Sequence, residues 1–148
     1  MRVSLKLIAA VELHNLTTVA SSLAEYGTMH PSLFAASNKL RGAVERSGAR
    51  LFKEADEIAG WHVFTRDAEK RVELDLSQRE VAMLQLLALI ASHKRSEADQ
   101  HLFGAQEQLA RKLLVCGADW QSGHGWVLQT GDVIPLPPPL LEKRRTNV

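Results

Sequence analysis

The spacing of hydrophobic residues predicts helices in the first third of the chain. An apolar run over residues 7–13 indicates one helix, and Asn15 or Thr17 can cap a second short helix that follows it. Pro31 suits the first turn of a third helix, because the N–H that proline lacks has no partner there. Apolar residues recur at helical spacing after Pro31, and Ser47 marks the expected end of this helix.

The pattern changes at Gly60 from helical spacing to alternation. Residues 61–65 are rich in aromatic and β-branched side chains, which favour a strand. Apolar and charged residues then alternate over residues 71–76, as in a strand with one buried and one solvent-facing side. A polar turn at residues 67–69 separates the two runs, so they are predicted to form a β-hairpin.

A helix-start signal follows this hairpin. Ser77 and Glu80 form a capping box, in which each side chain can accept a hydrogen bond from the other residue's backbone N–H. The helix that it opens is apolar almost all round, which predicts a central buried helix. A short helix from Ser96 to about Gly104 and a further helix over residues 105–115 are expected next.

The last part of the chain predicts a second hairpin and a tail. Residues 120–128 place two glycines between two tryptophans, which favours a β-hairpin with a glycine tip. From Ile134 onward, a run of prolines and a basic end predict an extended tail.

The order of these elements defines the predicted fold. Strand, strand, helix, helix, helix and hairpin is the layout of a winged helix. We therefore predict an α+β, mainly α, fold: a winged helix-turn-helix with two small β-hairpins and an N-terminal helical region. The predicted parts are residues 1–59 for the helical region (support, dimerisation or a second helix-turn-helix), 60–130 for the winged-helix domain and 131–148 for the Pro-rich, basic tail.

Composition narrows the class of protein. The chain has 148 residues, of which 45% are hydrophobic and 24% charged, as in an ordinary globular protein with a sizeable core. The formal net charge of +1 does not by itself require a polyanionic partner, although opposite charges elsewhere can hide a local basic face. The single cysteine, Cys116, and the lack of any stretch of about 20 apolar residues favour a cytoplasmic protein.

Three motifs in the second half resemble those of a known family. They are Leu76-Ser77-Gln78-Arg79-Glu80 with Leu84 and Leu87, then Leu109-Ala110-Arg111-Lys112-Leu113, and last Ser122-Gly123-His124-Gly125-Trp126-Val127-Leu128. In this order they resemble the winged-helix effector domain of the OmpR/PhoB type, over about residues 61–128. The resemblance implies a DNA-binding regulator with a recognition helix and a wing. Ser122 stands where the family's wing often has an arginine, and the family's long loop before the recognition helix is missing.

A fainter resemblance covers about residues 7–52. Residues 7–23 are similar in spacing to the helix-turn-helix of LysR-type regulators, and residues 50–52 are similar to the close of that motif. The resemblance implies a second DNA reader. The poorer match around Phe34 instead favours a helical support or dimerisation region.

The predicted recognition helix and the hairpin supply candidate DNA contacts. Glutamine can pair with adenine and arginine with guanine or phosphate, whereas Glu107 would repel phosphate. The candidate DNA-binding residues are Gln106, Gln108, Arg111, Lys112, Ser122 and His124. The chain's three tryptophans, Trp61, Trp120 and Trp126, are more typical of a core than of base stacking. No catalytic constellation, phosphate-binding loop or metal signature stands out, so we expect a non-enzyme without a cofactor or metal.

Two functions follow from these observations. The first is a DNA-binding transcriptional regulator that acts as a homodimer on double-stranded DNA. The alternative is a small protein-binding module, of the type of phage or mobile-element inhibitors and adaptors, that regulates another macromolecule without binding DNA. The near-neutral charge and Ser122 favour the alternative. A continuous positive face over residues 105–115 and 120–128 would favour DNA, whereas a neutral or apolar patch there would favour a protein partner.

Overall fold

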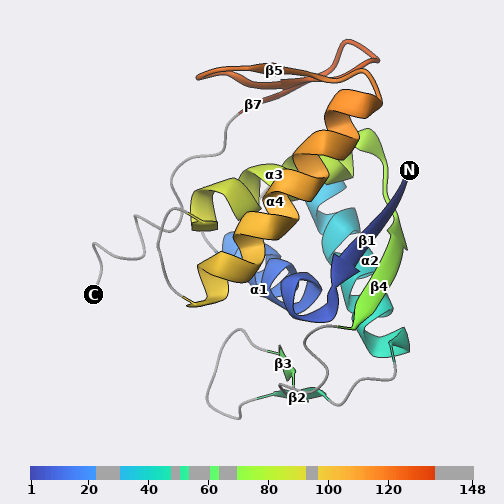
Figure 1. The fold of residues 1–148 in the computed structure, drawn as a ribbon, viewed down its shortest axis with the longest axis vertical. Coiled ribbons are helices and arrows are strands. Elements are labelled where there is room, and N and C mark those ends of the chain that lie inside the picture. Colours follow the sequence, from blue (N-terminus) through green and yellow to red (C-terminus); the bar gives the residue numbers. More distant parts are fainter. Residues whose placement is uncertain (23–30, 48–50, 54–60, 64–69, 93–96, 136–148) are drawn as a thin grey trace. The chain divides into compact units, whose positions relative to one another are not determined.

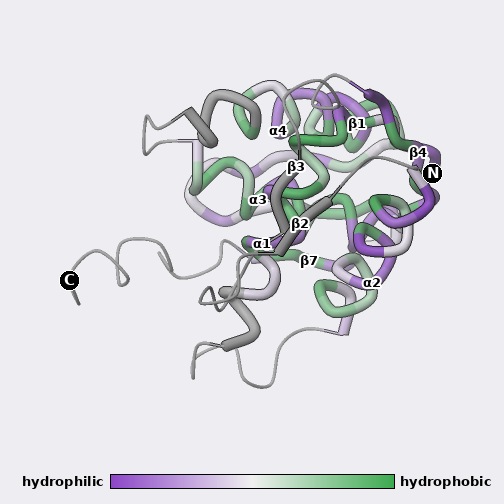
Figure 2. Tube along the Cα trace, turned by 90° about the horizontal axis from the view of Figure 1, so that it is seen from below, coloured by the Kyte–Doolittle hydropathy of each residue, from purple (hydrophilic) through white to green (hydrophobic). Residues whose placement is uncertain are grey.

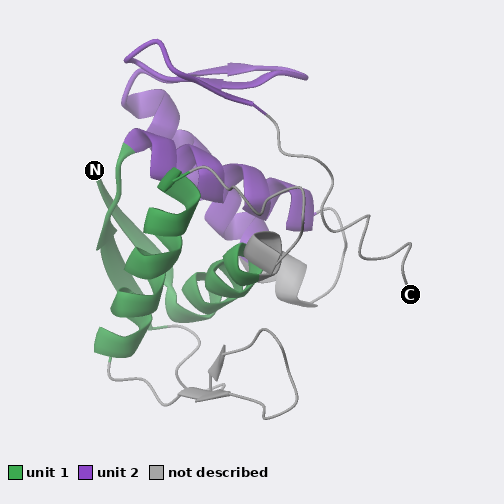
Figure 3. Ribbon diagram, turned by 180° about the vertical axis from the view of Figure 1, so that it is seen from behind, with its two compact units in different colours: residues 1–77 green, residues 78–148 purple. Residues whose placement is uncertain are grey.

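The computed structural model places the chain in the predicted fold class. It describes residues 1–22, 31–47, 51–53, 61–63, 70–92 and 97–135 (Figure 1). Side chains are described for residues 1–18, 31–47, 70–92 and 102–135. The chain forms two compact units, residues 1–77 and residues 78–148 (Figure 3). The α+β, mainly helical, class that the sequence predicts is confirmed.

The first unit contains two paired strands from distant parts of the sequence. Strand β1 (Arg2–Lys6) runs antiparallel to β4 (Arg71–Asp75), with Val3 opposite Leu74. The apolar residues of both strands are buried, and their polar residues alternate on the other face, as the period of two requires.

Two helices complete the described core of the first unit. Helix α1 (Leu7–Ser22) packs against α2 (Pro31–Arg46), and α2 also contacts β4 (Figure 1). Helix α2 begins at Pro31, as its sequence predicts, and buries one apolar face made of Leu33, Ala36, Leu40, Ala43 and Val44. Two strands, β2 (Leu51–Lys53) and β3 (Trp61–Val63), pair antiparallel to each other.

Helix α1 corrects the prediction of two short helices. It is continuous through Asn15 and Thr17, the two residues expected to cap a second helix. The Thr17 hydroxyl instead lies 2.6 Å from the carbonyl oxygen of His14, within the helix, and 2.9 Å from Oγ of Ser37 on α2. A threonine bonded back to the preceding turn has no need to end a helix, and Thr17 is fully buried.

The strand pairing corrects the first predicted hairpin. The runs at residues 61–65 and 71–76 do not pair with each other, because β3 pairs with β2 and β4 pairs with β1. Alternation identifies β4 as a half-buried strand but carries no information about which strand covers its edge. Since β4 belongs with β1, the two units divide after Ser77, whereas the predicted division lay at residue 60.

The second unit combines two helices with a small sheet. Helix α3 (Gln78–Ser92) begins directly after Ser77, as the capping box predicts, and packs against α4 (Glu97–Val115). Most of α3 is apolar, as its colouring in Figure 2 shows, and ten of its fifteen residues are buried. The prediction that this helix is largely buried is confirmed.

Helix α4 replaces the two helices predicted on either side of Gly104. This glycine lies inside α4, where an added Cβ would meet no atom of the described chain within 4 Å. One exposed glycine costs a helix only about 1 kcal/mol relative to alanine. Burying the four apolar residues on the other side of α4 outweighs that cost, so the helix continues; they are Leu102, Ala105, Leu109 and Leu113.

Three strands follow α4. Strands β5 (Asp119–Gln121) and β6 (Gly125–Val127) form the hairpin predicted over residues 120–128, with positive φ at Gly123 in its turn. Strand β7 (Val133–Pro135) adds to β6 as a third strand, inside the region expected to be an extended tail. Within the described helices, none is both long and apolar enough to cross a membrane.

Candidate functional site

Helix α4 carries the candidate recognition residues, and its two faces differ sharply. Five residues at helical spacing are buried on the inner face: Leu102, Ala105, Gln106, Leu109 and Leu113. Residues 103, 107, 111 and 114 occupy the opposite side and are exposed. The buried side chains of the inner face are not available to a partner.

The position of Gln106 corrects one predicted contact. Its side chain is 9% exposed, and its Oε1 accepts a hydrogen bond of 3.1 Å from Nε2 of Gln85 on α3. Oε1 of Gln85 in turn accepts a bond of 2.8 Å from the indole N–H of Trp126 on β6. Gln106 therefore ends a buried chain of hydrogen bonds and cannot read a base edge without breaking that chain.

The tryptophans support this interior. Trp126 is 2% exposed, and its ring centroid lies 5.1 Å from that of the partly buried Trp120 at an interplanar angle of 59°. The two residues face each other across β5 and β6, and Ile134 on β7 joins them on the buried side. The core interpretation is confirmed for Trp126, while the side chain of Trp61 lies outside the described residues.

The remaining candidates on α4 are accessible to different degrees. Gln108 is partly buried, and Arg111 and Lys112 are exposed. Because consecutive helical residues project about 100° apart, Arg111 and Lys112 do not share one face. Both lie in the last turns of α4, where positive charge complements the helix dipole.

Ser122 and His124 occupy the predicted hairpin tip. Both are exposed, and the His124 N–H donates to the carbonyl oxygen of Gln121 over 2.9 Å, which closes the turn between β5 and β6. Gly123 between them has φ 78°, a conformation that glycine adopts without strain. The hairpin follows α4 after three residues, so its tip and the end of α4 belong to one short stretch of chain.

Charge around these residues is mixed. Residues 102–135 contain the cations Arg111 and Lys112 and the carboxylates Glu107, Asp119 and Asp132. Asp132 lies 3.6 Å from Arg79, so one acid is partly compensated within the unit. The described part of this surface therefore offers no excess of positive charge.

Exposed apolar side chains are the feature that the sequence interpretation missed. Phe103 is 52% exposed and Leu114 is 53% exposed, and with Ala110 they form one line along α4, interrupted by Glu107. We call these four residues the α4 stripe. Its spacing of four, three and four residues is that of a helix that packs along another helix. Val115 beside it is 86% exposed. The four-three-four spacing of these residues is visible in the sequence and is the signal that could have identified them.

Comparison with protein-family models, with curated proteins and with solved structures gives no match for this chain. Within the described residues, no group of three or more histidine, cysteine or acidic side chains is placed to hold a metal ion.

Proposed function

We propose that this chain is a protein-binding module whose second unit associates through the α4 stripe, and that its partner is a second copy of the chain. The observation that carries the proposal is the alignment of the half-exposed Phe103 and Leu114 on one side of a 19-residue helix. Apolar side chains gathered in this way are typical of protein interaction sites. This proposal takes up the protein-binding function and the homodimer that the sequence suggests, acting in the cytoplasm.

The order of residues along the stripe favours a second copy. In an antiparallel pair of α4 helices related by a two-fold axis, Phe103 of each copy comes opposite Leu114 of the other. Glu107 of each copy then lies near Arg111 of the other, because the midpoints of the two pairs differ by only half a residue, about 0.75 Å along the helix. A surface with this order is complementary to itself in both shape and charge.

The expected affinity is modest. About half of Phe103 and of Leu114 is already buried, so dimerisation gains only the remaining half of each. Association also costs several kcal/mol of translational and rotational freedom. We therefore expect a dissociation constant in the range of tens to hundreds of micromolar, or about −5 to −6 kcal/mol.

Sedimentation over a concentration series tests the proposal. Wild type should shift from monomer to dimer, Leu114→Glu should stay monomeric, and Val133→Glu should dimerise like wild type. Val133 is the matched control because it is 57% exposed but lies on β7. A charge reversal adds a sharper criterion: Glu107→Arg and Arg111→Glu should each weaken the dimer, and the double reversal should restore it. A wild type that stays monomeric at about 1 mM, or equal weakening by Val133→Glu, refutes the proposal.

A DNA-binding transcriptional regulator is the second candidate. The observation in its favour is that Arg111 and Lys112 near the end of α4, and Ser122 and His124 in the turn between β5 and β6, are all exposed. If the first two contact phosphates, Arg111→Glu/Lys112→Glu should lower affinity for duplex DNA more than about tenfold. The double variant should also reduce the salt slope by about 1.8. A salt-series titration against a genomic fragment library measures both. Wild type that binds no fragment better than about 1 μM at low salt excludes this candidate.

A further inference from the structure

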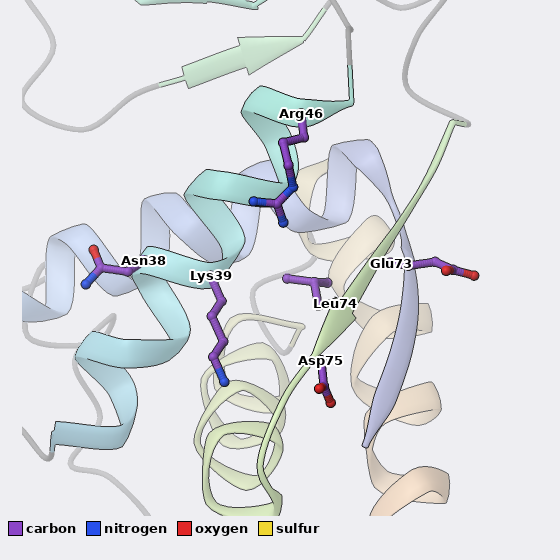
Figure 4. A pocket seen from close by; sticks show the side chains of 6 residues that line it. All are labelled: Asn38, Lys39, Arg46, Glu73, Leu74 and Asp75. Atoms are coloured by element: carbon purple, nitrogen blue, oxygen red, sulfur yellow. The ribbon is translucent and has the colours of Figure 1, made fainter.

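A groove in the first unit lies between α2 and one edge of β4. It has a volume of about 380 Å³ and is lined by Asn38, Lys39 and Arg46 of α2 and by Glu73, Leu74 and Asp75 of β4 (Figure 4). All six residues belong to the first unit. In Figure 4, the side chain of Leu74 points toward α2 and that of Glu73 points away from it.

The pairing of β4 with β1 shows which backbone groups reach the groove. The Leu76 N–H donates to the Met1 carbonyl and the Leu7 N–H donates to the Lys70 carbonyl, at the two ends of the ladder. In an antiparallel ladder, residue pairs joined by hydrogen bonds alternate with pairs that are not. The two bonds at the ends therefore identify which pairs between them are hydrogen-bonded. Val72 and Leu74 therefore exchange hydrogen bonds with β1.

The alternate residues of β4 direct their backbone groups the other way. The N–H and C=O groups of Arg71, Glu73 and Asp75 point toward the edge that β1 does not cover, and no other described strand pairs with β4. Glu73 and Asp75 are the two members of this set that line the groove. An unpaired row of donors and acceptors is a template for another strand.

Positive charge lines the helical wall of the groove. Lys39 and Arg46 are both exposed and lie two turns apart, about 10.5 Å along the axis of α2. The Arg46 guanidinium is folded back, because a Cβ added at Gly42 would come within 2.9 Å of its Nη1. Along the axis of α2, this brings the Arg46 charge roughly one turn, about 5.4 Å, closer to the level of Lys39.

Each carboxylate of β4 that lines the groove has a cation of β1 or the amino terminus beside it, which partly balances its charge. Glu73 lies 3.8 Å from Arg2, across the sheet on the β1 side. Asp75 lies 3.3 Å from the Met1 amino group, also on the β1 side. The groove therefore combines a β4 edge that no described strand covers on one wall with two cations, Lys39 and Arg46, on the other.

We propose that this groove binds an extended peptide as an additional strand on β4, with acidic side chains directed at Lys39 and Arg46. The backbone of the peptide would satisfy both donors and acceptors of the β4 edge, which a simple anion cannot do. Side chains of a strand alternate between faces, so the acidic residues must occur at every second position. The chain's own basic tail, which contains Lys143, Arg144 and Arg145, has the wrong charge for this site.

A peptide titration followed by NMR tests the proposal. The probe is the blocked pentapeptide Thr-Glu-Thr-Glu-Thr, with the same peptide carrying lysine for glutamate, and inorganic phosphate, as controls. We expect the glutamate peptide to bind with a millimolar or lower dissociation constant and to slow exchange of the Glu73 amide hydrogen about tenfold or more. The lysine peptide should bind at least about tenfold more weakly.

Two variants test separately what the backbone edge of β4 and what the cations of α2 contribute to peptide binding. Glu73→Pro removes an N–H that β1 does not use, so it should abolish binding and leave the Leu74 amide protected, whereas Glu73→Ala should bind like wild type. Lys39→Glu/Arg46→Glu should weaken binding at least about tenfold without touching the edge, which keeps the test valid if the proline variant fails to fold.

Three results would overturn the proposal. One is equal affinity of Glu73→Pro and Glu73→Ala for the peptide. Another is binding of phosphate as tight as that of the peptide with no protection of the Glu73 amide, which would mean a simple anion pocket. The third is the absence of any peptide binding at millimolar concentration.

Discussion

Replacing Gln85 by methionine should destabilise the second unit more than the same replacement of Gln106, its partner in the buried hydrogen-bond chain. Gln85 is 3% exposed and bonds in both directions, accepting from Trp126 and donating to Gln106. Methionine keeps the length of the side chain but leaves both partners buried without a bond. Each orphaned group costs about 1–3 kcal/mol, so we expect a loss of about 2–5 kcal/mol in the free energy of unfolding. That is a large share of the 5–15 kcal/mol typical of a domain.

Gln106→Met is the internal comparison. It orphans only one N–H of Gln85, so its cost should be about 1–2 kcal/mol. The double variant Gln85→Met/Gln106→Met should cost less than the sum of the two, because the orphaned acceptor of Gln106 is gone as well.

Urea unfolding followed by tryptophan fluorescence measures these differences. A Trp61→Phe background restricts the signal to Trp120 and Trp126, which both lie in the second unit. The slope of unfolding against urea should be unchanged, so that midpoint shifts report stability. Equal losses for Gln85→Met and Gln106→Met, or a loss below about 0.5 kcal/mol for Gln85→Met, would refute the reasoning.

Three further predictions concern stability. Gly104→Ala should raise the free energy of unfolding by about 0.5–1 kcal/mol, because the site is helical and open. Gly123→Ala should lower it by about 1 kcal/mol, because φ is 78° there. Urea midpoints of the two variants that move in the same direction would contradict this. Ser77→Ala should cost about 1 kcal/mol by removing the N-cap of α3, and an unchanged urea midpoint would show that Ser77 does not cap it. Burial of His14 and the nearby charge of Arg41 lower the pKa of His14 below 6.5, and Glu45 opposes this effect. The contribution of neutral His14 to stability should therefore be fully present above about pH 6.5 and be lost as the pH falls and His14 protonates. A His14→Asn variant with the same pH dependence of stability would contradict this cause.

Local signals account for the parts of the fold that the sequence predicts correctly. The start of α2 at Pro31, the start of α3 after Ser77 and the turn at Gly123 each depend on residues within one turn of chain. Their geometry follows from proline's missing N–H, the serine cap and the conformational freedom of glycine.

The errors arise where distant contacts outweigh local preference. Gly104 signals a break, but the buried face of α4 holds the helix together through it. Glutamine is usually a surface residue, but Gln106 belongs to the core because of distant partners. It bonds to Gln85, 21 residues away, and Gln85 bonds to Trp126, 41 residues away. The pairing of β1 with β4 has no local signature at all.

The pairing of β1 with β4 also determines when this sheet can form during synthesis. Arg2 is paired with Asp75, so the ribosome makes β1 first but must add more than 70 residues before its partner strand exists. At about 5–20 residues per second, the first strand waits for roughly 4–15 s. Throughout this interval the apolar side of β1 has no strand beside it, and neighbouring nascent chains or chaperones compete for its hydrogen-bonding edge. Slow codons between α2 and β4 should therefore raise aggregation of the newly made chain, whereas slow codons after β4 should not.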